Sequence, residues 1–238
     1  MKIGIIGYGS FGKLCAEVLK SYAEILIYDK KTQTDVKLTT FEAAAKSDVV
    51  ILSAGLQALA EVCRDLSVYV RPQALVIEVC AVKTVSMRIL KDALSGKCQL
   101  LSLHPLFGPQ TAEGSTLRGK KVVFIPVELE DQVKVKQLLR DILGLNVIEI
   151  TAEEHDREMA WVHGLTFFVG RGLLELDPPK SRLATGYYDK FLELVEFERG
   201  HSRELFDEVE SANPYSAGVR DRLMKQLKKL DAQLKEAK

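Results

Sequence analysis

Short runs of apolar residues alternate with helical patterns over the first 150 residues of the chain. The runs lie at Lys2–Ile6, Ile25–Tyr28, Val49–Leu52, Leu75–Val79, Leu100–Leu103, Val122–Ile125 and Val147–Ile150. Between several of them, apolar positions recur at helical spacing, over Phe11–Tyr22, Gln57–Val68, Val85–Leu94 and Glu130–Leu143. Strands that are buried on both faces give continuous apolar runs, and helices between them indicate parallel crossover connections. The pattern predicts an α/β fold with a doubly wound, mostly parallel sheet over residues 1–150.

The pattern changes near Thr151. From Ala152 onward the chain shows helical patterns only, which are interrupted at Asp177-Pro178-Pro179 and at Asn213-Pro214. Proline ends a helix because it lacks the amide donor and restricts the residue before it. The last helical pattern carries a leucine stripe, at Leu223, Leu227, Leu230 and Leu234. We therefore predict a second, smaller, all-helical domain over residues 151–238.

The composition narrows the classes of partner. Lysine plus arginine and aspartate plus glutamate each total 33, so the formal net charge is zero and nothing predicts binding to nucleic acid or to an anionic membrane. No apolar run approaches the ~20 residues of a membrane span. The N-terminus enters a strand pattern without a signal peptide, which predicts a cytoplasmic protein. The four cysteines are scattered without metal-ligand spacing, so we expect free thiols and no metal site.

A glycine pattern follows the first predicted strand. Gly7, Gly9 and Gly12 form G-x-G-x-x-G at the opening of a helix, the context in which this motif binds a dinucleotide. Gly7 permits the tight turn, Gly9 lets the backbone approach the pyrophosphate, and Gly12 lets the helix pack closely on the strand. We therefore expect a Rossmann domain whose cofactor contacts include Gly7, Tyr8, Gly9, Ser10, Phe11, Gly12 and, after the third strand, Ala54.

The end of the second predicted strand bears on the choice of cofactor. Asp29 lies about 20 residues beyond the glycine pattern, where a carboxylate accepts hydrogen bonds from the adenosine ribose. The same charge repels a 2′-phosphate, which favours NAD over NADP. Lys30 follows directly, is expected near the same cofactor, and would weaken that preference. The alternative for Asp29 is a solvated carboxylate at a strand end.

Two segments carry the candidate chemistry. Glu78–Thr84 closes one predicted strand and His104–Pro109 closes the next, and ligands bind at the carboxyl ends of parallel strands. A histidine at this place can titrate near neutral pH and face a nicotinamide. From the spacing alone, a catalytic and a structural role for His104 are equally open.

With these segments the sequence resembles the prephenate/arogenate dehydrogenase family. The resemblance covers nearly the whole chain, and H-P-L-F-G-P at His104–Pro109 is its most specific part. Its other elements are the glycine pattern, Val82-Lys83, Glu154-His155-Asp156, Pro179, Arg182, Thr185-Gly186-Tyr187 and Leu192–Glu196.

The resemblance implies a reaction and roles for particular residues. Family members transfer a hydride from the ring carbinol carbon of a cyclohexadienol to NAD(P), with loss of the ring carboxylate as CO2. By this resemblance, His104 accepts the proton of the ring hydroxyl and Arg182 binds the side-chain carboxylate of the substrate. Lys83 is expected at the cofactor, and Gln110 and Thr111 at the substrate. The family also dimerises through its helical domain, which predicts a homodimer here.

Three positions depart from the common family pattern. Ala81 replaces a frequent serine, Gln110 a frequent acidic residue, and Phe167 a second active-site histidine. His163 lies four residues before Phe167 and therefore on the same helix face, so we consider it a second catalytic residue that reaches the pocket from the neighbouring turn. A structural histidine is the alternative. His155 and Asp156 stand where residues cap a helix.

These departures leave several functions open. The neutral Gln110 favours prephenate over arogenate, because the ammonium of arogenate would need a carboxylate neighbour. The alternatives are an arogenate dehydrogenase, another dehydrogenase with a helical second domain, and a non-catalytic NAD-binding regulatory protein.

Overall fold

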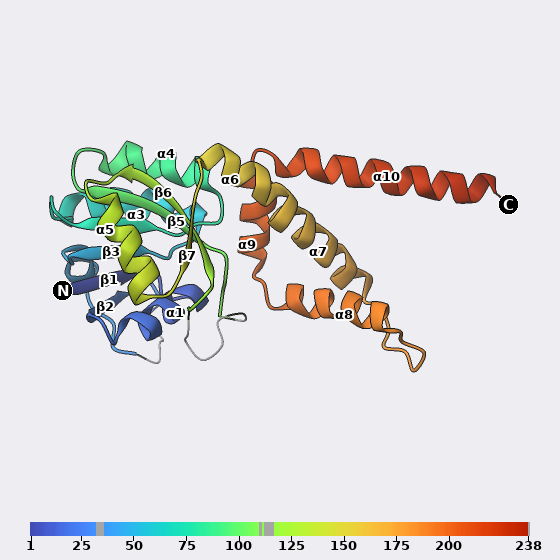
Figure 1. Cartoon of the computed structure of the whole chain (residues 1–238), viewed down its shortest axis with the longest axis horizontal. Coiled ribbons are helices and arrows are strands. Elements are labelled where there is room, and N and C mark those ends of the chain that lie inside the picture. Colours follow the sequence, from blue (N-terminus) through green and yellow to red (C-terminus); the bar gives the residue numbers. More distant parts are fainter. Residues whose placement is uncertain (32–35, 110, 112–116, 238) are drawn as a thin grey trace. The chain divides into compact units, whose positions relative to one another are not determined.

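The computed structural model describes residues 1–31, 36–109, 111 and 117–237 of the chain. It consists of two compact units, Met1–Ala152 and Glu153–Lys238 (Figure 1). The first unit contains the sheet, and the described part of the second is helical.

One seven-stranded sheet, in the order β2-β1-β3-β4-β5-β6-β7, forms the centre of the first unit. Its strands are β1 (Lys2–Ile6), β2 (Glu24–Tyr28), β3 (Val49–Leu52), β4 (Leu75–Glu78), β5 (Gln99–Pro105), β6 (Lys121–Glu128) and β7 (Asn146–Glu149). Neighbouring strands are parallel except for β5 and β6, which pair antiparallel. The prediction of a doubly wound, mostly parallel sheet is confirmed.

Helices cover the two faces of this sheet (Figure 1). They are α1 (Ser10–Leu19), α2 (Phe41–Ala45), α3 (Leu56–Tyr69), α4 (Lys83–Leu94), α5 (Gln132–Gln137) and its π-helical continuation η2 (Leu138–Ile142). Leu14 of α1 and Val135 of α5 pack against the core cluster that contains Leu103 on one face. On the other face, Met87 of α4 packs against the cluster that contains Val123.

The short helix α2 was not predicted from the sequence. It has five residues, too few to show a helical repeat, and its start is fixed by Thr40, whose side chain accepts a hydrogen bond from the amide of Ala43. Its last turn lies against β1, where a Cβ added to Gly4 would come within 2.0 Å of the carbonyl oxygen of Ala44. Gly4 thus lets α2 approach the sheet closely.

The second unit is a set of helices with breaks at the two predicted proline sites and one further break, at residues 200–202, that was not predicted. It contains α6 (Ala152–Met159), which begins at the last residue of the first unit, and then η3 (Ala160–Leu165), α7 (Thr166–Leu176), α8 (Gly186–Arg199), α9 (Arg203–Asp207), η4 (Glu208–Ala212) and α10 (Ser216–Glu236). α7 ends before Asp177-Pro178-Pro179 with Asp177 in the left-handed region, at φ 51°. Along α10, Leu227, Leu230 and Leu234 are exposed. No helix in the described part of the chain is long and apolar enough to span a membrane.

The four cysteines are all in the first unit and are free thiols. Cys63, Cys80 and Cys98 are buried, and Cys15 is half-buried. Burial raises the pKa of Cys15 and Cys63 to about 12 and that of Cys98 to about 11. These three thiols therefore stay protonated at neutral pH.

Candidate active site

The turn between β1 and α1 can be formed only with glycine at two of its positions. Gly7 has φ +101°, and a Cβ on it would lie 2.6 Å from the carbonyl oxygen of Ser53. A Cβ on Gly12 would lie 2.1 Å from the carbonyl oxygen of Gly7. Gly9 differs, because its added Cβ would meet no atom within 4 Å. The turn is thus closely packed on the protein side and open at Gly9.

The N-terminus of α1 fits an anionic group. Gly9 is the N-cap residue and provides no side-chain cap, and the first turn of α1 contains no acidic residue. The amide groups at this end therefore keep their partial positive charge. Open space at Gly9 beside these amides is the arrangement that binds the diphosphate of a dinucleotide. Next to the turn, the Lys13 ammonium lies 5.3 Å from the centre of the Tyr8 ring, and the Phe11 and Phe107 rings are 6.4 Å apart.

Asp29 links the end of β2 to the glycine turn. Its Oδ2 accepts a hydrogen bond of 2.6 Å from the amide of Tyr8, and its Oδ1 accepts one of 2.7 Å from the amide of Lys31. A carboxylate has about four acceptor positions, so Asp29 retains capacity for ribose hydroxyls. The Lys30 ammonium lies 2.9 Å from Glu61 of α3, and this pairing raises the pKa of Lys30. The positive charge of Lys30 is thus paired with the carboxylate of Glu61.

The carboxyl ends of four parallel strands bring the candidate residues of the first unit to one edge of the sheet. The register aligns Ile6, Leu52, Glu78 and Ser102 in one row. The glycine turn follows Ile6 directly, and Ala54 lies two residues beyond Leu52. His104 lies two residues beyond Ser102, is 5% exposed, and is placed opposite Val123 of β6.

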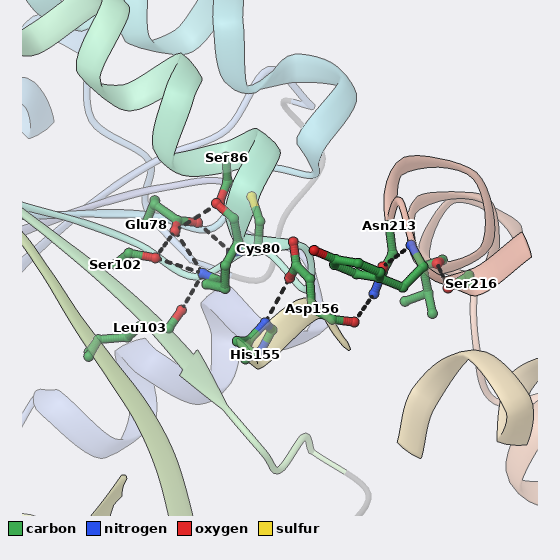
Figure 2. A network of polar contacts seen from close by, with 12 residues as sticks. Glu78, Cys80, Ser86, Ser102, Leu103, His155, Asp156, Asn213 and Ser216 are labelled. Atoms are coloured by element: carbon green, nitrogen blue, oxygen red, sulfur yellow. Dashed lines mark hydrogen bonds and ion pairs between the residues drawn. The ribbon is translucent and has the colours of Figure 1, made fainter. Parts of the chain in front are cut away.

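Lys83, which is expected at the cofactor, lies in a buried network of polar groups. It is the first residue of α4, and its side chain is fully buried. Its ammonium lies 2.7 Å from Glu78 Oε1, and it also bonds Ser102 and the carbonyl oxygen of Leu103 (Figure 2). The contact of Lys83 with a cofactor stays a prediction, and its ammonium also bonds these protein oxygens.

The residues expected at the substrate are spread over the chain. Gln110 lies outside the described residues. Thr111 is exposed, and its Oγ1 accepts a hydrogen bond of 3.0 Å from the amide of Gly108. Arg182 is exposed in the turn between α7 and α8. His104 and the glycine turn thus belong to the first unit, whereas Arg182 and His163 belong to the second.

His163 forms part of an aromatic stack in the second unit. Its ring stacks on that of Phe167 at 5.1 Å and 14° between planes, and the Phe167 ring lies 4.6 Å from that of His201. Burial, and then the neighbouring His155 and His201, lower the pKa of His163 to about 4. His163 is therefore neutral at physiological pH. The stack agrees with the spacing of four residues, although His163 itself lies in the π-helical segment η3.

The sequence analysis missed His201 and its partner Glu198. Glu198 is 1% exposed, and its two carboxylate oxygens lie 2.7 Å from an Arg171 nitrogen and 3.2 Å from Nδ1 of His201. His201 is 34 positions after Phe167, so no local pattern connects them. The spacing of three residues between Glu198 and His201 at the end of α8 was the only available signal.

His155 and Asp156 do not cap a helix as expected. They are the fourth and fifth residues of α6, inside the helix, and both are buried. His155 Nδ1 lies 2.8 Å from Asp156 Oδ1, and the side-chain amide of Asn213 donates to the carbonyl oxygen of Asp156 (Figure 2).

In the described part of the chain, no three histidine, cysteine, aspartate or glutamate side chains are arranged to hold a metal ion.

Comparison with known proteins gives a matching family model and several relatives of this chain. A family model described as "Prephenate dehydrogenase, nucleotide-binding domain" matches residues 24–148. A relative from Methanocaldococcus jannaschii, "Probable arogenate/prephenate dehydrogenase", is 26% identical over 85% of this chain and 47% of its own length. The Arabidopsis thaliana protein "Arogenate dehydrogenase 2, chloroplastic" is 25% identical over 100% of this chain and 69% of its own. The chain thus spans about half the length of the first of these relatives.

Solved structures share the fold over almost the whole chain. Prephenate dehydrogenase from A. aeolicus, solved with hydroxyphenyl propionate and NAD+, superposes with a TM-score of 0.75 at 19% identity and covers 99% of this chain and 92% of its own. Synechocystis arogenate dehydrogenase gives a TM-score of 0.68, also at 19% identity, and covers 99% of this chain and 93% of its own.

Proposed function

The chain belongs to the prephenate dehydrogenase family, and we propose that it oxidises prephenate to 4-hydroxyphenylpyruvate and CO2 with NAD as the hydride acceptor. The observation that carries this proposal is the position of His104 on the sheet edge that also carries the glycine turn. Three strand spacings of about 4.8 Å separate β1 from β5, roughly 14 Å in all. A dinucleotide whose diphosphate binds at Gly9 can extend over that distance towards β5.

In this proposal His104 handles the proton of the reaction. When bound, the nicotinamide accepts the hydride from the ring carbinol carbon. His104 accepts the hydroxyl proton as that carbon becomes a carbonyl. The ring carboxylate then leaves as CO2, its bonding electrons make the ring aromatic, and the phenolate oxygen takes the proton back from His104. A general base of this kind contributes about 10²–10⁴-fold to the rate.

Asp29 supports NAD rather than NADP. Its carboxylate is held by the amides of Tyr8 and Lys31 at the end of β2, where it would accept the ribose hydroxyls and repel a 2′-phosphate. The positive charge of Lys30 is balanced by Glu61, which reduces its attraction for a phosphate. The A. aeolicus structure that shares this fold was solved with NAD+.

The substrate residues of the second unit follow from the family resemblance. We assign Arg182 to the side-chain carboxylate of the substrate, since its exposed guanidinium can form a bidentate contact. Gln110 and Thr111 are assigned to the same substrate. We also assign a second catalytic role to His163, as a neutral hydrogen-bonding group because of its lowered pKa. The exposed leucines of α10 are assigned to a homodimer contact.

Arogenate is the second candidate substrate. The Arabidopsis relative that aligns with the whole chain is named an arogenate dehydrogenase. Arogenate carries an ammonium where prephenate carries a keto group, and the oxidation at the ring is the same.

The test is NADH or NADPH formation by the purified protein, with prephenate or arogenate and with NAD or NADP. We expect turnover with prephenate and NAD that falls at least 100-fold in His104→Asn, because the base is lost. Preference for arogenate would correct the substrate and keep the reaction class. Binding of NAD without turnover on either substrate would refute the dehydrogenase proposal and support a regulatory protein.

A further inference from the structure

A buried ion pair between Lys83 and Glu78 contacts the end of β5, the strand that carries His104. Lys83 and Glu78 are both 0% exposed. The Lys83 ammonium lies 2.7 Å from Glu78 Oε1, and it donates to Ser102 Oγ at 3.1 Å and to the carbonyl oxygen of Leu103 at 2.7 Å. An ammonium has three donors, and three oxygens surround this one (Figure 2).

Glu78 is held as completely as Lys83. Its Oε2 accepts a hydrogen bond of 2.9 Å from the amide of Cys80, and its Oε1 accepts one of 3.0 Å from Ser86 Oγ. The Ser102 hydroxyl donates to the same Oε1. The pair therefore joins the end of β4, the start of α4 and the end of β5.

A gain in the stability of the fold is by itself a weak explanation for the presence of this buried ion pair. Removing two charges from water costs free energy that their attraction only partly recovers, and well-packed apolar residues often stabilise a protein as well or better. A buried pair with complete hydrogen bonding instead fixes the geometry of the atoms it contacts. On β5, those atoms belong to the two residues that directly precede His104.

We propose that Lys83 and Glu78 are positioning residues that hold His104 for proton transfer. The carbonyl bonded by Lys83 belongs to the peptide that joins Leu103 to His104. Ser102 lies two residues before His104, and therefore on the same face of the strand. Through these two contacts Lys83 fixes both the main chain and the strand face from which the imidazole projects. This inference rests on the proposed role of His104 as the base.

The test separates positioning from stability with two variants and one control. Lys83→Met removes the ammonium and leaves Glu78 buried without it. The double variant Glu78→Gln/Lys83→Met removes both charges at similar volume, so it regains stability that the single variant loses. Leu66→Ala, at a fully buried position of α3 outside the network, is a control for a general loss of stability. Measurements are urea unfolding, kcat, KM for prephenate and Kd for NAD.

We expect kcat to fall about 10- to 100-fold in both Lys83 variants, the size of effect that a small misplacement of a reacting group causes. KM and the Kd for NAD should stay within about twofold of wild type, as should kcat in Leu66→Ala. Recovery of kcat together with stability in the double variant would overturn the proposal and leave the pair a purely structural role.

A second measurement does not depend on turnover. The imidazole signals of His104 in ¹H–¹³C NMR spectra are identified by their loss in His104→Asn. We expect these signals to shift in both Lys83 variants and to stay in place in Leu66→Ala, and unchanged signals in the Lys83 variants would refute positioning. If the wild type turned over neither substrate, the proposed function would fail while this measurement still decided whether Lys83 positions His104.

Discussion

Replacing His163 by phenylalanine should make the second unit less sensitive to acid. In the folded protein the pKa of His163 is lowered from 6.5 to about 4, mainly by burial. Between these pH values the unfolded chain binds a proton that the folded chain does not. The free energy of unfolding therefore falls as the pH drops below 6.5. Phenylalanine cannot bind this proton and can keep the ring stacking on Phe167.

The size of the effect follows from the shift. The difference between 6.5 and about 4 corresponds to about 3 kcal/mol at about 1.4 kcal/mol per pKa unit. The full loss is reached only below the folded pKa, so at about pH 5 the wild type should have lost roughly 2 kcal/mol relative to about pH 8 through this group. The His163→Phe variant should lose about that much less over the same interval.

Trp161 provides the assay, because it is the single tryptophan of the chain and lies in η3 two residues before His163. Urea unfolding followed by its fluorescence, at about pH 8 and about pH 5, gives the two free energies for each protein. Val162→Ala, at an exposed neighbouring position, controls for perturbation of the Trp161 signal. Equal losses in the wild type and in His163→Phe would refute the assignment of a buried, neutral His163.

Three further predictions concern the ligand sites. Gly7→Ala should weaken NAD binding at least tenfold in calorimetry, because a Cβ there would lie 2.6 Å from the Ser53 carbonyl oxygen at a φ of +101°; unchanged affinity would contradict the proposed diphosphate site. Asp29→Ser should raise the ratio of kcat/KM with NADP to that with NAD about tenfold or more, since the carboxylate that repels a 2′-phosphate is gone, and an unchanged ratio would remove Asp29 from the ribose site. Arg182→Gln should raise KM for prephenate about 10- to 100-fold, the loss of a charged hydrogen-bonded contact, with Lys180→Gln as the exposed control; equal KM values in the two variants would exclude Arg182 as the carboxylate ligand.

The sheet could be predicted from the sequence because its strands are buried on both faces. Runs such as Val49–Leu52 then contain no polar position, and the helices between them show their own repeat. The direction of β6 could not be predicted in the same way. Its apolar run is the same in either direction, and only its antiparallel pairing with β5 shows which one the fold adopts.

The candidate site was predictable where a local motif carries the geometry. The glycine turn and the strand end at His104 are both contiguous in sequence, and both lie at the carboxyl edge of the sheet. The surroundings of Lys83 are not contiguous, because Ser102 is 19 residues away and approaches only when α4 packs on β5. The sequence alone therefore could not show that Glu78, Ser102 and the Leu103 carbonyl supply oxygens to the Lys83 ammonium. The contact of His201 with Phe167 was hidden for the same reason.

The distribution of two rare side chains gives each unit its own reporter. All four cysteines belong to the first unit, and three of them have pKa values of about 11 to 12, so an alkylating reagent should modify these three only after that unit opens. The single tryptophan belongs to the second unit. Thiol labelling and tryptophan fluorescence, both measured on the wild-type protein, can therefore distinguish a chain that unfolds in one cooperative step from one whose two units open independently.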